Sequence, residues 1–308
     1  MSLYGFMTKT QVCCSCIYCK KRYSDKDRFI LSLSCMRAAL LDGKVIFITG
    51  WTSGIGRATV LIALREWARV VFTGRNQAEA ERLRNEAYQL WFLPDCVHFI
   101  ACDVTDAAGI QAAVEETVMK YGQIDGVFAN AGRHMVGTVE ETTLEQWRTM
   151  FAIDVEGVFL TLKYTIPHLK AWVRDASGTR HGGSVVLMWS DQCLIGKGKS
   201  SAYGAAKWAV GQLAKSTAID YAVDNIRVNC ICPGTIDTPL ARGAMQGFAD
   251  KNFGGDMIAG MTFLEKAQPM QRLGTAEEVA ETVVFMLSDK PGFMTGSLIS
   301  IDGGYVAG

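Results

Sequence analysis

The feature that most constrains the fold is a regular alternation, from Asp42 onward, of short runs rich in Val, Ile and Phe with longer segments of helical periodicity. Strand, helix and strand repeated in this order predict a parallel sheet with helices on both faces. We therefore predict an α/β fold, a doubly wound parallel sheet of about seven strands in a single domain. Strands are expected at residues 44–49, 70–73, 97–101, 126–130, 184–188, 227–231 and 297–301, and helices at 56–67, 78–90, 107–121, 144–173, 201–223 and 276–287.

A sheet of this kind binds ligands at the carboxyl ends of its strands. Residues 239–273 interrupt the alternation with five glycines between the sixth strand and the last helix. Long insertions without a strand partner are usually lids or disordered loops. We expect residues 239–273 to close over a substrate. Their apolar side chains either form a partly apolar wall of the substrate site or make packing contacts only: Met245, Phe248, Phe253, Met257 and Met261.

Charge and cysteine placement exclude several classes of partner. The chain has 31 basic and 31 acidic residues among 308, which argues against a nucleic-acid or anionic-membrane surface. No run approaches the roughly 18 apolar residues of a spanning helix. Five of the ten cysteines lie in the first 35 residues, and the others lie in apolar segments where a free thiol acts as a small filler. Without a signal-peptide pattern, these features predict a reducing, cytoplasmic location and no membrane partner.

Residues 1–41 differ in character from the rest and are predicted to be a disordered or loosely docked extension before a domain at 42–308. The spacing of Cys13, Cys16 and Cys19 could hold a soft metal. However, a closed zinc site takes about four ligands and no histidine lies nearby, so we predict no metal site. Met36 is an alternative natural start.

Glycines follow the first expected strand and open the first expected helix. Gly50, Gly54 and Gly56 let the backbone turn sharply, approach a pyrophosphate and pack the helix on the sheet. The free N–H groups at the helix start attract an anion. This position indicates a dinucleotide site in preference to a plain tight turn.

The end of the second strand is where preferences for NAD and NADP diverge. No acid stands in the sequence around Gly74 and Arg75 to bind ribose hydroxyls. Gly74 leaves room for a 2′-phosphate, and Arg75 can pair with it through its planar fork. We favour NADP, with NAD as the alternative if Arg75 is only a solvated surface charge.

Tyr203 and Lys207 are four residues apart on an expected helix and share one face. A lysine ammonium about 4 Å from a phenol is worth roughly 4 kcal/mol at an effective dielectric of about 20, enough to lower a tyrosine pKa by about three units. Such a phenol is a usable acid or base. The alternative is an ordinary amphipathic surface.

Together these residues resemble the short-chain dehydrogenase/reductase (SDR) family over essentially all of residues 42–308. The resemblance rests on the Thr-Gly-x3-Gly-Ile-Gly loop, Asn130-Ala131-Gly132, Ser190 thirteen positions before Tyr203, the Tyr203-x3-Lys207 motif, Pro233-Gly234 and Asp302-Gly303-Gly304. It implies a Rossmann-like fold and a nicotinamide-dependent oxidoreductase. Tyr203 would be the acid/base, Ser190 would bind the substrate oxygen and Lys207 would hold the nicotinamide ribose.

The same resemblance implies a homotetramer and a set of cofactor contacts. Asp103 would meet adenine, Asn130 the adenosine side, and Ile236 and Thr238 the carboxamide and phosphates. The full implied cofactor set is Gly50, Thr52, Ser53, Gly54, Ile55, Gly56, Arg75, Asp103, Val104, Asn130, Ala131, Gly132, Tyr203, Lys207, Pro233, Gly234, Ile236 and Thr238.

Two positions depart from the family pattern. Asp154 stands where a helix asparagine usually supports a proton relay to the lysine. An ionised Asp154 close to Lys207 would raise the pKa of Tyr203 and move the activity optimum to higher pH. Trp51, in the glycine loop, is bulkier than the usual small residue and puts the local adenosine contacts in doubt.

The expected reaction is hydride transfer between NADP(H) and a carbonyl or secondary alcohol. Asp191 and Gln192 follow the fifth strand and either bind substrate hydroxyls or cap a loop. Their polarity keeps open an NAD-dependent polyol or sugar dehydrogenase. A non-catalytic dinucleotide-binding regulator is the alternative of another class. The four histidines, His98, His134, His168 and His181, have no metal-ligand spacing and are expected to be structural or exposed.

Overall fold

The computed structural model describes residues 39–51, 53–169 and 182–307. The described residues from Leu40 onward belong to one compact unit. Leu41 is fully buried in it, and its amide donates to the carbonyl of Glu66. The expectations for the extension and its cysteines, for Thr52, for His181 and for the end of the helix at 144–173 lie outside the described residues.

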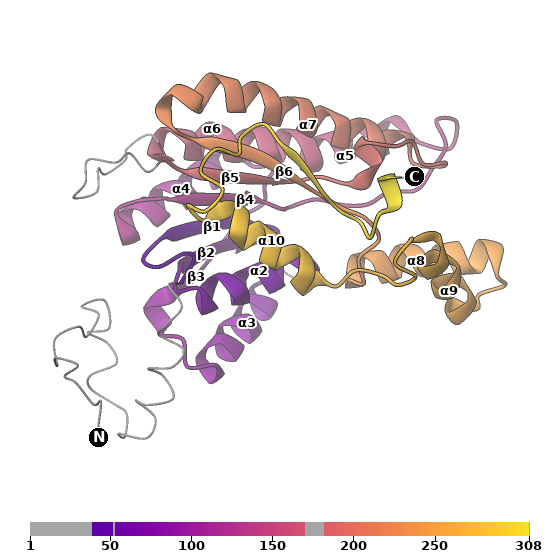
Figure 1. The fold of residues 1–308 in the computed structure, drawn as a ribbon, viewed down its shortest axis with the longest axis horizontal. Helices are drawn as coiled ribbons and strands as arrows, with labels where there is room; N and C mark the ends of the chain where they lie inside the picture. The colour runs from indigo at the N-terminus through magenta and orange to yellow at the C-terminus, as the bar shows by residue number, and fades with distance from the viewer. Residues whose placement is uncertain (1–38, 52, 170–181, 308) are drawn as a thin grey trace, which may run out of the picture. The chain divides into compact units, whose positions relative to one another are not determined.

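The unit is built on one parallel sheet of seven strands in the order β3-β2-β1-β4-β5-β6-β7, which confirms the predicted architecture (Figure 1). The order reverses between β1 and β4, the neighbouring strands at which the chain changes its direction of winding. The strands are β1 (Val45–Thr49), β2 (Arg69–Gly74), β3 (Val97–Ala101), β4 (Gly126–Ala129), β5 (Ser184–Met188), β6 (Arg227–Pro233) and β7 (Leu298–Ile301).

Helices cover both faces of the sheet, as Figure 1 shows. Side chains alternate along each strand, so a strand buried on both faces is apolar throughout. In β1, Ile46 and Ile48 join the core beneath α2 and α10, while Phe47 joins the core on the other face. One face carries α2 (Gly54–Arg65), α3 (Gln77–Gln89) and α10 (Ala276–Leu287), and the other carries α4 (Ala107–Tyr121), α6 (Gly157–Leu169) and α7 (Ser201–Tyr221).

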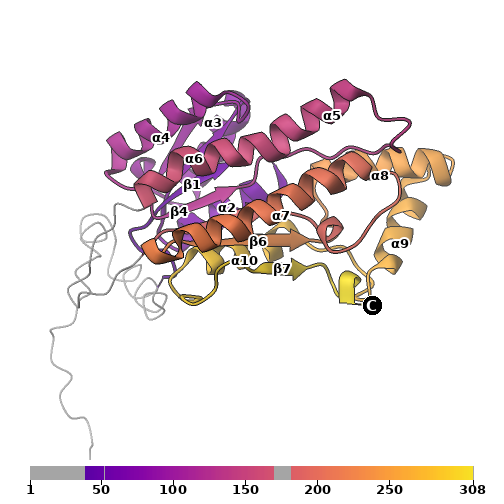
Figure 2. The same cartoon turned by 90° about the horizontal axis from the view of Figure 1, so that it is seen from above.

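The single helix predicted at 144–173 is divided. It consists of α5 (Leu144–Phe151), a π-helical turn at Ala152–Glu156 and α6, and the two helices run beside α7 in Figure 2. Such wide turns are rare and frequently mark functional sites. The turn places Asp154 fully inside the protein.

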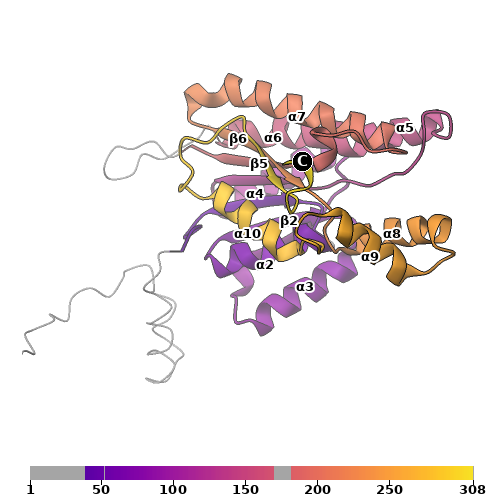
Figure 3. The ribbon, with the colours of Figure 1, turned by 45° about the vertical axis from the view of Figure 1, so that its right-hand side comes forward.

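Most of residues 239–273 is helical, so the segment is not the disordered loop that was one of the two alternatives from the sequence, and its role as a lid stays a prediction. They form α8 (Pro239–Asn252) and α9 (Met257–Ala267), which lie together beyond one end of the sheet in Figure 3. The two helices pack closely because Gly260 has no side chain, and a Cβ there would lie 3.0 Å from the Cβ of Ala249. In the described part of the chain, none of the helices has the length and apolar character needed to cross a membrane.

Candidate active site

Because all strands are parallel, the segments that follow β1, β4, β5 and β6 meet at one edge of the sheet. These segments carry the glycine loop, Asn130 to Gly132, Ser190 and Thr238 respectively. Lys207 and Tyr203 reach the same edge from α7, because the Lys207 ammonium donates to the carbonyl of Met188 at the end of β5, at 3.3 Å.

The glycine loop is held against the end of β4 by contacts that only glycine allows. A Cβ on Gly50 would lie 2.3 Å from the Cα of Ala131, and one on Gly56 would lie 2.2 Å from the carbonyl oxygen of Gly50. The Asn130 side-chain amide donates to that same carbonyl. Asn130, expected on the adenosine side, therefore anchors the loop itself.

The start of α2 fits a bound anion. The helix has Ser53 at its N-cap with no side-chain capping hydrogen bond and no acidic residue in its first turn, so its first amides are available to a phosphate. Gly54 faces Thr238, whose Cγ2 would lie 2.9 Å from a Cβ at that position. Thr238 also caps α8, since its hydroxyl accepts from the amide of Ala241 at 3.2 Å. The residues present thus fit the pyrophosphate of a dinucleotide.

Arg75 and Asp103 lie together at the ends of β2 and β3, away from the lysine and tyrosine of α7. Arg75 has a 76% exposed side chain, and its guanidinium lies 3.4 Å from Asp103. The backbone amide of Thr105 donates to Asp103 and holds the pKa of that carboxyl below its usual range, with Arg75 contributing in the same direction. Trp51 does not cover this region, because it is turned into the core with 1% of its surface exposed.

Lys207 is buried beside a buried carboxylate. Its Nζ lies 3.0 Å from Oδ1 of Asp154, which also accepts the backbone amide of Arg133 through Oδ2. Burial opposes the charge of Lys207, but Asp154 and Tyr203 outweigh it and raise the pKa of the lysine. A Cβ on Gly132 would lie 2.9 Å from Asp154 and 3.4 Å from Lys207, so this glycine packs against the ion pair.

Tyr203 lies between Lys207 and two other polar side chains. The Lys207 Nζ is 5.6 Å from its ring centroid, and the His134 ring meets it edge-on with centroids 4.9 Å apart. Burial raises the pKa of Tyr203 and Asp154 adds to the rise, whereas Lys207 and a hydrogen bond with Ser190 lower it. The net direction of the Tyr203 pKa is upward, opposite to that expected from Lys207 alone, because burial outweighs the effect of the lysine. The sequence pattern does not show this burial.

Ser190 belongs to a second polar chain. Its hydroxyl donates to Asp191 at 3.0 Å and accepts the backbone amide of Gln192 at 3.2 Å. Asp191, only 2% exposed, pairs through its other oxygen with Lys197 at 2.6 Å. The side-chain carbonyl of Gln192 is buried and has no hydrogen-bond partner among the described residues. Asp191 therefore orients Ser190, while Gln192 retains an unused acceptor.

The remaining positions implied as cofactor contacts lie at and after the end of β6, after β3 and at the start of α2. Pro233 ends β6, Gly234 donates its amide to Ile301 at 3.2 Å, and the buried Ile236 packs against Gly274. Val104 packs against Gly157 at the start of α6, and Ile55 packs into the core beneath α2.

His134 and Lys197 were not singled out as site residues by sequence. Burial and the charge of Lys197 lower the pKa of His134, which indicates a neutral imidazole beside Tyr203. His134 follows Gly132 by two residues, and Lys197 lies between Ser190 and Tyr203. Their positions next to these motifs are the signal that could have identified them.

Comparisons with known proteins agree with this geometry. A family model described as Enoyl-(Acyl carrier protein) reductase matches residues 50–306. The chain is 32% identical over 269 residues to trans-4-hydroxycyclohexanecarboxylate dehydrogenase of Sinomonas cyclohexanicum, covering 86% of this chain and 93% of that protein. It is 32% identical to the NADP-dependent (R)-specific alcohol dehydrogenase of Lentilactobacillus kefiri, covering 87% of this chain and 98% of that one.

A solved dehydrogenase structure is also similar to this chain. Thermoplasma acidophilum aldohexose dehydrogenase in ligand-free form superposes with a TM-score of 0.75 at 31% identity, covering 88% of this chain and 97% of its own. These matches extend over most of the chain. They agree with the observed fold, the glycine loop and the buried lysine beside a tyrosine. The chain belongs to the short-chain dehydrogenase/reductase family and is an NAD(P)-dependent oxidoreductase.

Proposed function

We propose that the protein interconverts a secondary alcohol and a ketone with NADP(H), using Tyr203 as the acid/base. The observation that carries this proposal is the placement of the Tyr203 phenol beside the Lys207 ammonium and within hydrogen-bonding reach of Ser190. These groups meet at the sheet edge that also carries the uncapped start of α2. Bound nicotinamide cofactor would supply or accept the hydride.

The protein's own residues handle the substrate oxygen and its proton. In the oxidising direction, the Tyr203 phenolate accepts the proton of the substrate hydroxyl, and in the reducing direction the phenol returns it to the new alkoxide. Ser190 donates to the substrate oxygen in place of Asp191, and the backbone amide of Gln192 continues to orient its hydroxyl. Lys207 stabilises the phenolate, and Asp154 offsets part of that effect.

The preference for NADP is supported by the second strand. Arg75 is largely exposed at the carboxyl end of β2, with its guanidinium available to a 2′-phosphate. The neighbouring Gly74 offers no carboxylate to ribose hydroxyls. The Lentilactobacillus kefiri relative is described as NADP-dependent, which supports the same assignment.

A polyol or sugar substrate is the second candidate, and Gln192 is the observation that favours it. Its side-chain carbonyl is buried directly after Ser190 and has no partner in the part of the chain that the structure describes, and such an acceptor suits a further hydroxyl on the substrate. The similar structure of an aldohexose dehydrogenase supports this candidate. A substrate panel that pairs each simple ketone with a hydroxylated analogue separates the two classes.

The helices α8 and α9 are proposed as a lid over the substrate. Phe248, Phe253 and Phe263 pack together with ring centroids 5.6–5.8 Å apart, so a partly exposed aromatic cluster joins the two helices. Met245 is 3% exposed and belongs to the same segment. Two helices joined by such contacts can move as a unit and exclude water when substrate is bound.

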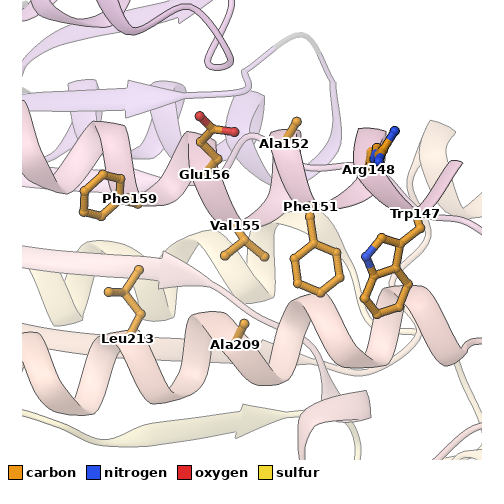
Figure 4. A pocket seen from close by; sticks show the side chains of 9 residues that line it. All are labelled: Trp147, Arg148, Phe151, Ala152, Val155, Glu156, Phe159, Ala209 and Leu213. Carbon is orange, nitrogen blue, oxygen red and sulfur yellow. The ribbon is translucent and has the colours of Figure 1, made fainter. Parts of the chain in front are cut away.

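A homo-oligomer is proposed through the outer surfaces of α5, α6 and α7. Figure 4 shows an apolar groove there, where Phe151 and Val155 lie opposite Ala209 and Leu213. Phe159 beside it is 47% exposed, which favours burial against a second copy. Analytical ultracentrifugation of wild type and Phe159→Glu tests this, and an unchanged sedimentation coefficient for a variant of unchanged secondary structure would count against it.

A cytoplasmic location is proposed from the thiols. The cysteines in the described part of the chain are free, and burial raises the pKa of Cys230 to about 12, so it stays a thiol.

The proposed oxidoreductase function is tested by following nicotinamide absorbance with both cofactors over a carbonyl and alcohol panel on the full chain. Tight nucleotide binding without turnover would instead indicate the non-catalytic regulator.

A further inference from the structure

Trp51 fills a space beside the end of β2, where the adenosine end of a bound cofactor is expected. It is 1% exposed and meets Phe72 edge-on with ring centroids 4.6 Å apart, and Phe99 at 5.5 Å. Its indole N–H is buried without a hydrogen-bond partner in the part of the chain that the structure describes. Because two rings of neighbouring strands fix the indole, it cannot turn aside cheaply.

The indole lies directly against Gly74, the last residue of β2. A Cβ at Gly74 would lie 2.7 Å from Nε1 of Trp51 and 3.2 Å from its Cδ1. Gly74 does not have a positive φ, so its backbone conformation would accept other residues. Trp51 is therefore the obstacle to a side chain at position 74.

Position 74 is also where an acid would stand if the protein used NAD. In this fold, a carboxylate near the end of the second strand binds the ribose hydroxyls and repels a 2′-phosphate. A side chain cannot be built there without displacing Trp51. Because Gly74 has no side chain, Arg75 is the charged group expected next to the adenosine ribose, and it favours a 2′-phosphate on that ribose.

We propose that Trp51 is a residue that determines cofactor specificity: by occupying the volume beside Gly74, it excludes a ribose-binding acid and commits the site to NADP. This inference rests on the proposed NADP preference. It predicts that an acid at position 74 is tolerated only when Trp51 has been made small. Position 51 acts through position 74, without itself touching the nucleotide.

The test is a double-mutant cycle on the full chain with Gly74→Asp, Trp51→Ala and their combination. Thermal unfolding reports the steric coupling, and isothermal titration with NADPH and NADH reports specificity. Gly74→Ala isolates the Cβ without a charge. Gly243→Asp is the matched control, because a Cβ there meets no atom of the described residues within 4 Å. Trp51→Leu replaces Trp51→Ala in the cycle if the cavity left by alanine prevents folding.

We expect Gly74→Asp to lower Tm by at least about 3 °C more than Gly243→Asp does, and to weaken binding of both nucleotides. When position 51 already carries the small residue, Gly74→Asp should cost little in Tm. It should also reverse the cofactor preference to NADH by at least about tenfold. Additive losses of Tm would overturn the proposal, as would a stable Gly74→Asp single variant that prefers NADH. Wild type preferring NADH would refute the proposed NADP dependence, whereas the Tm coupling would still decide the steric claim.

Discussion

Replacing Asp154 with asparagine should move the pH dependence of turnover to lower pH. Lys207 Nζ lies 3.0 Å from Asp154 and 5.6 Å from the Tyr203 ring centroid, which places the carboxylate within about 9 Å of the ring. A unit charge at about 9 Å is worth about 1.8 kcal/mol at an effective dielectric of about 20, which corresponds to about 1.3 pH units. Removing a negative charge favours the phenolate, so the midpoint should fall by about one unit.

The sign is the same in both directions of reaction. Oxidation needs the Tyr203 phenolate, so its rate rises with pH, and in Asp154→Asn that rise should begin at lower pH. Reduction needs the phenol, so its decline at high pH should also begin earlier. The assay is kcat/KM across about pH 6–11 for both directions. Glu156→Gln is the control, because this exposed residue lies on the same π-helical turn.

Superimposable pH profiles for wild type and Asp154→Asn would refute the reasoning, as would a shift to higher pH. The asparagine keeps a carbonyl for the backbone amide of Arg133, which now donates to the carboxylate. A profile that moves equally in the Glu156→Gln control would show that general surface charge is responsible.

Three further changes test other parts of the site and fold. Arg75→Ala should weaken NADPH binding by about 10- to 100-fold and leave NADH nearly unchanged by titration calorimetry at low salt, and equal losses would contradict the 2′-phosphate contact. Gln192→Leu should raise KM for hydroxylated substrates more than for simple ketones, and a uniform change would remove the substrate contact. Thr275→Ala should lower the free energy of unfolding by about 1 kcal/mol in urea, because Thr275 and Glu278 form the capping box of α10, and an unchanged midpoint would oppose this.

The fold was largely predictable because buried parallel strands are continuous apolar runs. The strands at 97–101 and 184–188 have the predicted bounds. The strand predicted at 227–231 runs two residues further because Cys232 and Pro233 still pair with β7. That extension depends on a partner strand far along the chain, which local composition does not show.

The π-helical turn and the helices α8 and α9 were not predictable from local pattern. Ala152–Glu156 has ordinary helical composition, and Asp154 meets its partner Lys207 only through the packing of α7. The glycine-containing segment that suggested a lid or a disordered loop is mostly helical, and its Gly260 allows close helix packing. In both places tertiary contacts outweigh local propensity.

In the candidate active site, too, some features could be predicted from the sequence and others depend on tertiary contacts. Motif spacing located Tyr203 and Lys207, and the structure brings them together. The upward direction of the Tyr203 pKa depends on burial, and the inward turn of Trp51 depends on rings from two other strands. These properties arise from the surroundings of each side chain, so a motif alone does not contain them.

The acid/base role of Tyr203 is tested most directly by the turnover of Tyr203→Phe. This variant removes the phenolic oxygen and keeps the ring against His134 and Lys207. Tyr164→Phe is the matched control, because Lys163 Nζ lies 5.5 Å from the ring centroid of Tyr164 on α6. We expect Tyr203→Phe to lower kcat by about 10²- to 10⁴-fold with NADPH binding nearly unchanged, and the control to keep its activity. Wild-type turnover by Tyr203→Phe would contradict the assignment of Tyr203 as the acid/base.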